Sequence, residues 1–252
     1  MRLALQWILS LLFILQMYLM MPLMAVFFFP LAVIDRKWAY RGVRSYCRWV
    51  RFSARWLVGL RSEIRGTVPT GEVLIASKHQ SFFDIIMIVS AVPRPKFIMK
   101  KQLKWAPILG WFALRIGCVP VDRGKRGKAI RQMLADVRSG DAPAGQLIIF
   151  PQGTRVAAGA YLPYKVGVGV LYRELGQTCI PTATNVGVFW PRHGILRKRG
   201  LAVVEFLEPI PPGLELNDFM ARLEPRIENA SNALMREAGL QLEGEGEVPG
   251  ND

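Results

Sequence analysis

Residues 73–92 read VLIASKHQSFFDIIMIVSAV, in which two apolar runs are separated by a short polar stretch. The first run, residues 73–77, has the length of a buried strand, and the second, residues 82–92, has the length of a helix. A strand that leads directly into a helix is the repeating unit of α/β domains. The polar residues between the two runs, which include His79, are therefore expected at the end of a strand.

Further short apolar runs alternate with helical stretches along the rest of the chain. Strands are expected at residues 96–99, 118–121, 146–150, 180–188 and 201–207. Helices are expected at residues 127–138, 166–175 and 217–238. This alternation predicts an α/β fold, with a mixed, largely parallel sheet flanked by helices.

The N-terminal segment contains no charged residue from Leu3 to Ile34. It is long enough to cross a hydrocarbon core, which needs about 20 apolar residues. It is too long for the apolar part of a signal peptide, and no small-residue cleavage site follows it. Pro22 allows two interpretations, a single tilted span or a bent segment that enters one leaflet and returns. We favour the bent segment, with its break near Pro22.

A basic amphipathic helix is expected directly after this segment. Its basic residues are spaced four, three, four, three and four apart, which places them on one helical face. They are Lys37, Arg41, Arg44, Arg48, Arg51 and Arg55. With Trp49 and Trp56 nearby, the pattern favours the headgroup layer of an anionic bilayer over a merely solvated face. Positive charge directly after the apolar run also predicts that the rest of the chain is cytoplasmic.

The composition agrees with a membrane-associated protein. The 252 residues carry a formal net charge of +14, and 51% of them are hydrophobic, so a membrane partner is favoured over nucleic acid. Three distant cysteines, Cys47, Cys118 and Cys179, predict reduced thiols and no metal or disulfide framework. We expect a membrane-anchoring helical segment at residues 1–64, an α/β domain at 65–240 and an acidic flexible tail at 241–252.

Three polar clusters follow expected strands. They are Ser77-Lys78-His79, Asp122-Arg123 and Pro151-Gln152-Gly153-Thr154-Arg155. In open α/β sheets, ligands bind beyond the carboxyl ends of the strands. If these strands are parallel, the clusters converge on one site.

His79 and Asp84 are the candidate catalytic pair. An imidazole can accept a proton near pH 7, and a carboxylate can fix its tautomer. The five-residue spacing works if His79 lies in the turn before the helix and folds back over Asp84. The pair by itself is also typical of a capping or core histidine beside an incidental aspartate. Because the sequence has no nucleophile elbow, Walker loop or dinucleotide fingerprint, we expect His79 to activate a substrate hydroxyl.

The chain resembles the 1-acyl-sn-glycerol-3-phosphate acyltransferase family. The resemblance covers roughly residues 73–211, more than half of the chain, and rests on an ordered set of blocks. These are H-x-x-x-x-D at His79 to Asp84, GCVPVDR at residues 117–123, FPQGTR at residues 150–155 and IPTATN at residues 180–185. Departures from the family pattern are Lys78 for the usual Asn, Gln152 for the usual Glu, and the polar pair Thr184 and Asn185.

The resemblance implies transfer of a fatty acyl group from acyl-CoA or acyl-carrier protein to the sn-2 hydroxyl of lysophosphatidate. His79 would deprotonate that hydroxyl, Asp84 would orient His79, and no acyl-enzyme would form. The implied substrate-binding residues are Lys100, Arg123, Gly153, Thr154 and Arg155. No cofactor or metal is implied. A different lysolipid acceptor, such as a lyso-aminolipid, and a non-enzymatic basic membrane-surface protein are the alternatives.

Overall fold

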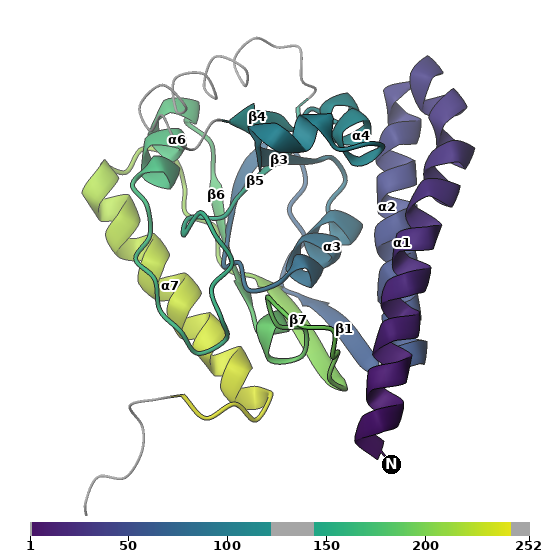
Figure 1. The fold of residues 1–252 in the computed structure, drawn as a ribbon. Coiled ribbons are helices and arrows are strands. Elements are labelled where there is room, and N and C mark those ends of the chain that lie inside the picture. The colour runs from purple at the N-terminus through teal and green to yellow at the C-terminus, as the bar shows by residue number, and fades with distance from the viewer. Residues whose placement is uncertain (1, 122–143, 243–252) are drawn as a thin grey trace, which may run out of the picture.

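The computed structural model describes residues 2–121 and 144–242 of the chain (Figure 1). Some of the expected features lie outside these residues. They are the helix at residues 127–138, the Asp122-Arg123 cluster and the tail from Glu243. The three cysteines are buried and unpaired, as the sequence predicts.

Seven strands of the described residues form one sheet, in the order β1-β7-β6-β2-β5-β3-β4. Their bounds are β1 (Leu60–Arg65), β2 (Val73–Ser77), β3 (Pro95–Lys100), β4 (Val119–Val121), β5 (Gln146–Ile149), β6 (Cys179–Thr184) and β7 (Gly200–Phe206). From β6 to β4 all neighbours are parallel, whereas β6 and β7 are antiparallel. The predicted mixed, largely parallel sheet is confirmed.

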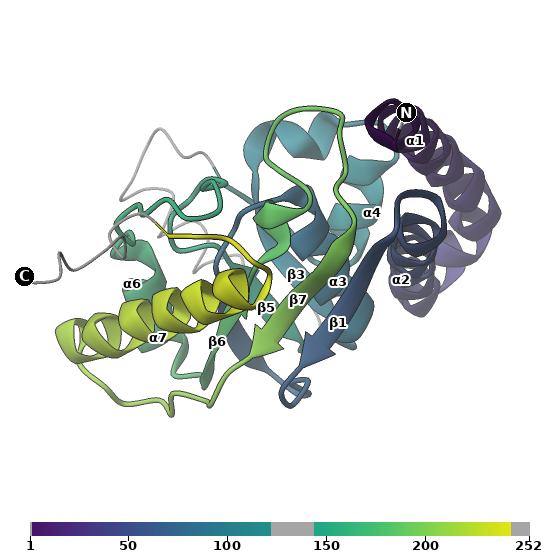
Figure 2. The same cartoon turned by 90° about the horizontal axis from the view of Figure 1, so that it is seen from below.

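Helices cover both faces of this sheet (Figures 1 and 2). One face carries α1 (Arg2–Ile34), α2 (Arg36–Ser53) and α3 (Phe82–Ala91), and the other carries α6 (Gly167–Leu175) and α7 (Leu216–Glu237). The short α4 (Leu109–Arg115) packs near α2.

Strand β2 alternates between these two layers. Ile75 packs among residues of α1, α2 and α3, whereas Leu74 and Ala76 pack among residues of α6 and α7. Because successive side chains of a strand point to opposite faces, His79 is directed toward the α3 layer and Lys78 toward the α7 layer. His79 and Lys78, although adjacent in sequence, therefore lie on opposite faces of the sheet.

Helix α1 is continuous from Arg2 to Ile34, with Pro22 inside it, so the predicted break near Pro22 is wrong. A proline in an apolar helix removes one hydrogen bond without ending the helix. The chain turns instead at Asp35, whose carboxylate accepts a hydrogen bond from the Lys37 backbone N–H at 2.8 Å. Helix α2 then runs back beside α1 (Figure 1). Residues 3–34 are long and apolar enough to cross a membrane, and most of their large side chains are exposed.

The six basic residues of the predicted amphipathic stripe, five in α2 and Arg55 just after it, divide into two groups. Arg44 donates hydrogen bonds to the carbonyl oxygens of Val92 and Pro93, and Arg51 donates to Ser62 and Ser90. These two arginines therefore attach α2 to the α/β domain, which the helical spacing does not reveal. The other four, Lys37, Arg41, Arg48 and Arg55, are exposed.

Three further details differ from the sequence prediction. Strand β1 and helix α4 were not predicted, because β1 is a polar edge strand and α4 has only seven residues. The strand expected at residues 180–188 ends at Thr184, and Val186–Val188 forms a 3₁₀ turn. The Asn185 side chain occupies the turn and bonds to the backbone of Val203 and Leu234.

The end of β1 provides a test of the fold. Gly66 has a φ of +73°, and a Cβ there would lie 2.0 Å from the Phe206 carbonyl oxygen, whereas Gly71 has a φ of +77° with nothing within 4 Å. Gly71→Ala should cost about 1–2 kcal/mol from the left-handed backbone alone. Gly66→Ala should cost about 1–3 kcal/mol more, because the carbonyl belongs to a strand that cannot shift freely. Thermal unfolding in detergent measures the difference, and equal shifts in Tm would contradict the close approach.

Candidate active site

His79 and Asp84 are in direct contact at the carboxyl end of β2. The Nδ1 atom of His79 lies 2.9 Å from Oδ1 of Asp84. The Asp84 side chain is fully buried, whereas the His79 side chain is 13% exposed. Because an ionised carboxylate only accepts hydrogen bonds, this contact requires Nδ1 to be the donor, and in the neutral ring that leaves Nε2 to accept a proton. The expected folding-back of His79 over Asp84 is therefore present.

The same carboxylate caps helix α3. Oδ2 of Asp84 accepts hydrogen bonds from the backbone N–H groups of Gln80 and Ser81, both at 2.8 Å. The Ser81 hydroxyl in turn accepts from the Phe83 N–H, which completes a capping box. A carboxylate at a helix N-terminus is also stabilised by the helix dipole. Asp84 thus links the start of α3 to the imidazole.

Aromatic rings fix the imidazole on its other side. The His79 ring stacks on Phe150 with centroids 4.0 Å apart, and Phe97 stacks on Phe150 with centroids 6.4 Å apart. The His79 carbonyl oxygen accepts a hydrogen bond from the Val156 N–H at 2.8 Å. The segment after β5 is therefore held against His79 by both side chain and backbone, as the convergence of strand ends predicts.

The FPQGTR segment forms a tight turn after β5. The Gly153 N–H donates to the Phe150 carbonyl oxygen at 2.9 Å, and Gly153 has a φ of +70°. A Cβ at Gly153 would lie 2.6 Å from the Nζ atom of Lys165. The left-handed backbone therefore favours glycine here, and the Lys165 ammonium lies directly over it. Lys165 is exposed and was not among the predicted site residues.

The remaining predicted binding residues are Arg155, Thr154, Lys100 and Arg123, and the structure describes the first three of them. Arg155 donates from its guanidinium to the Arg192 carbonyl oxygen at 3.4 Å, and Arg192 returns a hydrogen bond to the Arg155 carbonyl at 3.1 Å. Thr154 is half-buried beside Arg155, and Lys100 is exposed at the end of β3. Arg123 lies outside the described residues. The structure brings Arg192 close to Arg155, a contact that no local pattern in the sequence indicates.

Lys78 and Gln152, the two departures from the family pattern near His79, are both buried. Gln152 is buried, and its Nε2 donates to the Leu162 carbonyl oxygen at 3.1 Å. Its Oε1 is buried and accepts no hydrogen bond from the described residues. Lys78 has a fully buried side chain and forms an ion pair with Glu228 of α7. Tyr164 donates a second hydrogen bond to Glu228 at 2.9 Å.

This buried group lies on the opposite face of the sheet from His79. Burial raises the pKa of Tyr164, and the charge of Glu228 raises it further, so the phenol remains a donor.

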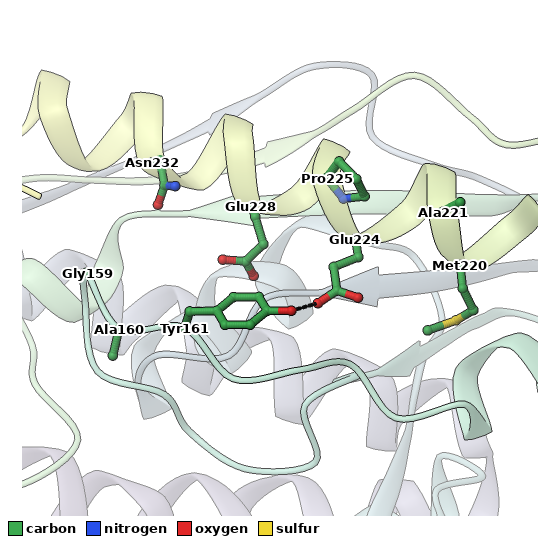
Figure 3. A pocket seen from close by; sticks show the side chains of 9 residues that line it. All are labelled: Gly159, Ala160, Tyr161, Met220, Ala221, Glu224, Pro225, Glu228 and Asn232. Carbon is green, nitrogen blue, oxygen red and sulfur yellow. Dashed lines mark hydrogen bonds between the residues drawn. The ribbon is translucent and has the colours of Figure 1, made fainter. Parts of the chain in front are cut away.

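Glu228 also lines a pocket of about 500 Å³ between α7 and the 159–161 loop (Figure 3). Tyr161 donates to Glu224 at 2.6 Å in the same pocket. Of the two carboxylates that line this pocket, Glu228 is paired with Lys78, and Glu224 accepts the Tyr161 hydroxyl.

Trp190 connects the apolar helix α1 to the site. Its ring stacks on Phe83 with centroids 5.0 Å apart, directly beside Asp84 in sequence. On another side it contacts Phe13 of α1 edge-on at 5.4 Å. The apolar helix α1 and the helix that carries Asp84 are thus joined through one aromatic side chain.

Breaking the Lys78–Glu228 pair should be costly. Glu228→Gln keeps an acceptor for Tyr164 but leaves the buried Lys78 charge unpaired, so the free energy of unfolding should fall by about 3 kcal/mol. Lys78→Met combined with Glu228→Gln removes both charges and should recover most of this loss. Denaturant unfolding of the single and double variants measures the effect. A double variant as unstable as the single one would show that the pair is not the source of the loss.

Comparison with known proteins identifies the family. The acyltransferase family model matches residues 60–185, half of the chain, so the chain belongs to the acyltransferase family. It is 28% identical over 173 residues to a 1-acyl-sn-glycerol-3-phosphate acyltransferase of Pseudomonas aeruginosa, covering 66% of each chain. It is also 28% identical over 199 residues to the alpha form from Bos taurus, covering 77% of this chain and 69% of that one. The chain thus spans about two thirds of the length of these relatives.

A solved structure supports the fold. The crystal structure of the 1-acyl-sn-glycerophosphate acyltransferase from Thermotoga maritima matches with a TM-score of 0.73 and 18% sequence identity. The match covers 89% of this chain and 97% of that chain. It confirms the arrangement of helices around the mixed sheet.

Proposed function

We propose that this acyltransferase moves a fatty acyl group from a thioester donor to the sn-2 hydroxyl of lysophosphatidate, which yields phosphatidate. The observation that carries the proposal is the contact between His79 Nδ1 and the buried Asp84 carboxylate, at the carboxyl edge of the sheet. The curated relatives from Pseudomonas aeruginosa and Bos taurus bear the name of this activity, which supports the acceptor.

The mechanism needs one base and no enzyme nucleophile. Nε2 of His79 takes the proton of the sn-2 hydroxyl as the oxygen attacks the thioester carbon. The imidazolium that forms is stabilised by Asp84 across the 2.9 Å contact. The C–S bond then breaks, and the departing thiolate receives the proton from His79. The base is thereby restored without an acyl-enzyme.

Basic side chains at the same edge are suited to the acceptor's phosphate. Arg155 directly precedes Val156, whose N–H donates to the His79 carbonyl oxygen, and the Lys165 ammonium lies over Gly153 in the turn before Arg155. A guanidinium offers a planar fork to phosphate, and an ammonium offers a point charge. We assign the phosphate to Arg155 and Lys165, with Lys100 and Arg123 as further contacts. Gly153 and Thr154 shape the turn beside the reacting carbon.

Membrane attachment fits a lipid substrate. The exposed apolar side of α1 suits contact with lipid, and the exposed basic residues of α2 suit an anionic surface. Because positive charge follows α1 directly, we propose that the α/β domain lies at the cytoplasmic face. The acyl donor is acyl-CoA or acyl-carrier protein, and the proposed reaction requires no cofactor or metal.

Acyl transfer assays test this proposal. The purified chain is supplied with one labelled acyl thioester and a panel of lysolipids that includes lysophosphatidate and a lyso-aminolipid. Labelled phosphatidate is the expected product. His79→Ala should lower kcat/KM by about 100-fold or more, the usual scale for loss of a general base. His193→Ala, which changes the chain's other histidine in an exposed loop, is the matched control and should leave the rate unchanged.

Two results would contradict different parts of the proposal. Acylation of a non-phosphate lysolipid without acylation of lysophosphatidate would exclude the proposed acceptor but retain the reaction class. Equal activity of His79→Ala and the unaltered chain would exclude His79 as the base. It would favour the alternative of a basic membrane-surface protein.

A further inference from the structure

Four arginines converge on a groove at the edge of the sheet, away from His79. The groove has a volume of about 430 Å³, and Arg48, Arg51, Phe52 and Arg55 of the α2 region line one side. Arg61, Ser62 and Glu63 of β1 and Leu201 of β7 line the other side. Strands β7 and β6 separate β1 from β2, which leads to His79. The groove is therefore a second basic site, distinct from the proposed catalytic one.

The charge of this groove is not balanced by the carboxylate that lines it. Glu63 is already bonded to Arg65, with its Oε1 atom 2.8 Å from the Arg65 Nε. Among the described residues, Arg51 donates to uncharged groups, namely the hydroxyls of Ser62 and Ser90 and the Ser62 carbonyl, at 2.8–3.2 Å. Burial lowers the pKa of Arg51, and the charge of Arg48 lowers it further. An anion in the groove would relieve this repulsion.

The position of Arg55 depends on an irregular helix end. After Ser53, the chain forms a π-helical turn at Ala54–Val58 before Gly59 ends it in a left-handed conformation. Such widened turns are frequent at functional sites. Arg61 enters from the following strand, so the groove combines a helix end with a strand rather than one helical face. This distinguishes it from a simple stripe of surface charge.

An aromatic row adjoins the same groove and indicates what kind of anion it holds. Trp49, Phe52 and Trp56 follow one another along the helix, with neighbouring ring centroids 5.9 and 6.1 Å apart and ring planes tilted by 37° and 53°. Trp56 is 71% exposed, and Phe52 is 55% exposed. The Trp49 indole N–H donates to Gln16 of α1 at 2.7 Å, so the row continues from the lipid-facing helix. Exposed aromatic rings beside arginines are typical of the membrane interface.

We propose that this groove binds the phosphate headgroup of an anionic membrane phospholipid, with the aromatic row against the glycerol and upper acyl chain. Arg48, Arg55 and Arg61 contact the phosphate, and Arg51 forms the fixed base of the site. A free phosphate ion shares the headgroup chemistry but would gain nothing from the aromatic row. The site is separate from acyl transfer, so the proposal does not depend on the proposed function.

A binding experiment with the full chain in non-ionic detergent tests the proposal. The probe is fluorescently labelled, short-chain phosphatidylglycerol, and labelled phosphatidylcholine of the same length is the neutral-headgroup comparison. Arg55→Ala combined with Arg61→Ala should raise the Kd for phosphatidylglycerol about tenfold or more, since both removed cations face the headgroup. Lys37→Ala with Arg41→Ala removes the same charge from exposed positions of α2 outside the groove. This matched control should change the Kd by less than about twofold.

Three results would overturn the proposal. Equal weakening by both double variants would mean that charge alone attracts the lipid. Equally tight binding of phosphatidylcholine would exclude an anionic headgroup site. Displacement of the probe by an equal concentration of inorganic phosphate would assign the groove to a free anion. If the double variant unfolds, Arg61→Gln alone, at an exposed position of the edge strand, makes the same comparison with Arg41→Gln.

Discussion

The buried carboxylate of Asp84 is the constraint on which the site depends. One of its oxygens accepts two backbone N–H groups at the start of α3, and the other holds the imidazole of His79. A buried carboxylate is stable only when such donors satisfy it. The helix start, the turn that carries His79 and the orientation of the ring are therefore determined together. Because the carboxylate that holds the imidazole also caps the helix, the proposed base needs no separate support on that side.

The sheet separates the aromatic side chains around His79 from the buried ion pair of Lys78. On the α3 face, His79 stacks on Phe150, and Trp190 links Phe83 to the apolar helix α1. On the α7 face, Lys78 is neutralised by Glu228. Alternation along β2 thus places the Lys78 side chain on the other face of the sheet from the imidazole. A lysine beside a proton-accepting histidine on the same face would disfavour protonation of that histidine.

Much of this arrangement could be predicted from the sequence. The bounds of β2 and α3 and the contact between His79 and Asp84 follow from a strand, a short polar turn and a helix with an N3 carboxylate. The failures involve tertiary contacts. Pro22 does not break α1, and β1 is too polar to be recognised without its neighbour β7. Lys165 is brought over Gly153 only by the fold of the intervening loop, and the roles of Arg44 and Arg51 depend on what packs against α2.

The tautomer of His79 tests the central claim most directly. Because the chain has only two histidines, His193→Gln leaves a single imidazole whose ¹⁵N resonances can be assigned without ambiguity. For the neutral ring, NMR should show a protonated Nδ1 and a proton-free Nε2, as the Asp84 contact requires. Asp84→Asn should abolish this preference. A neutral His79 that carries its proton on Nε2 would contradict the account, since that nitrogen could not accept the substrate's proton.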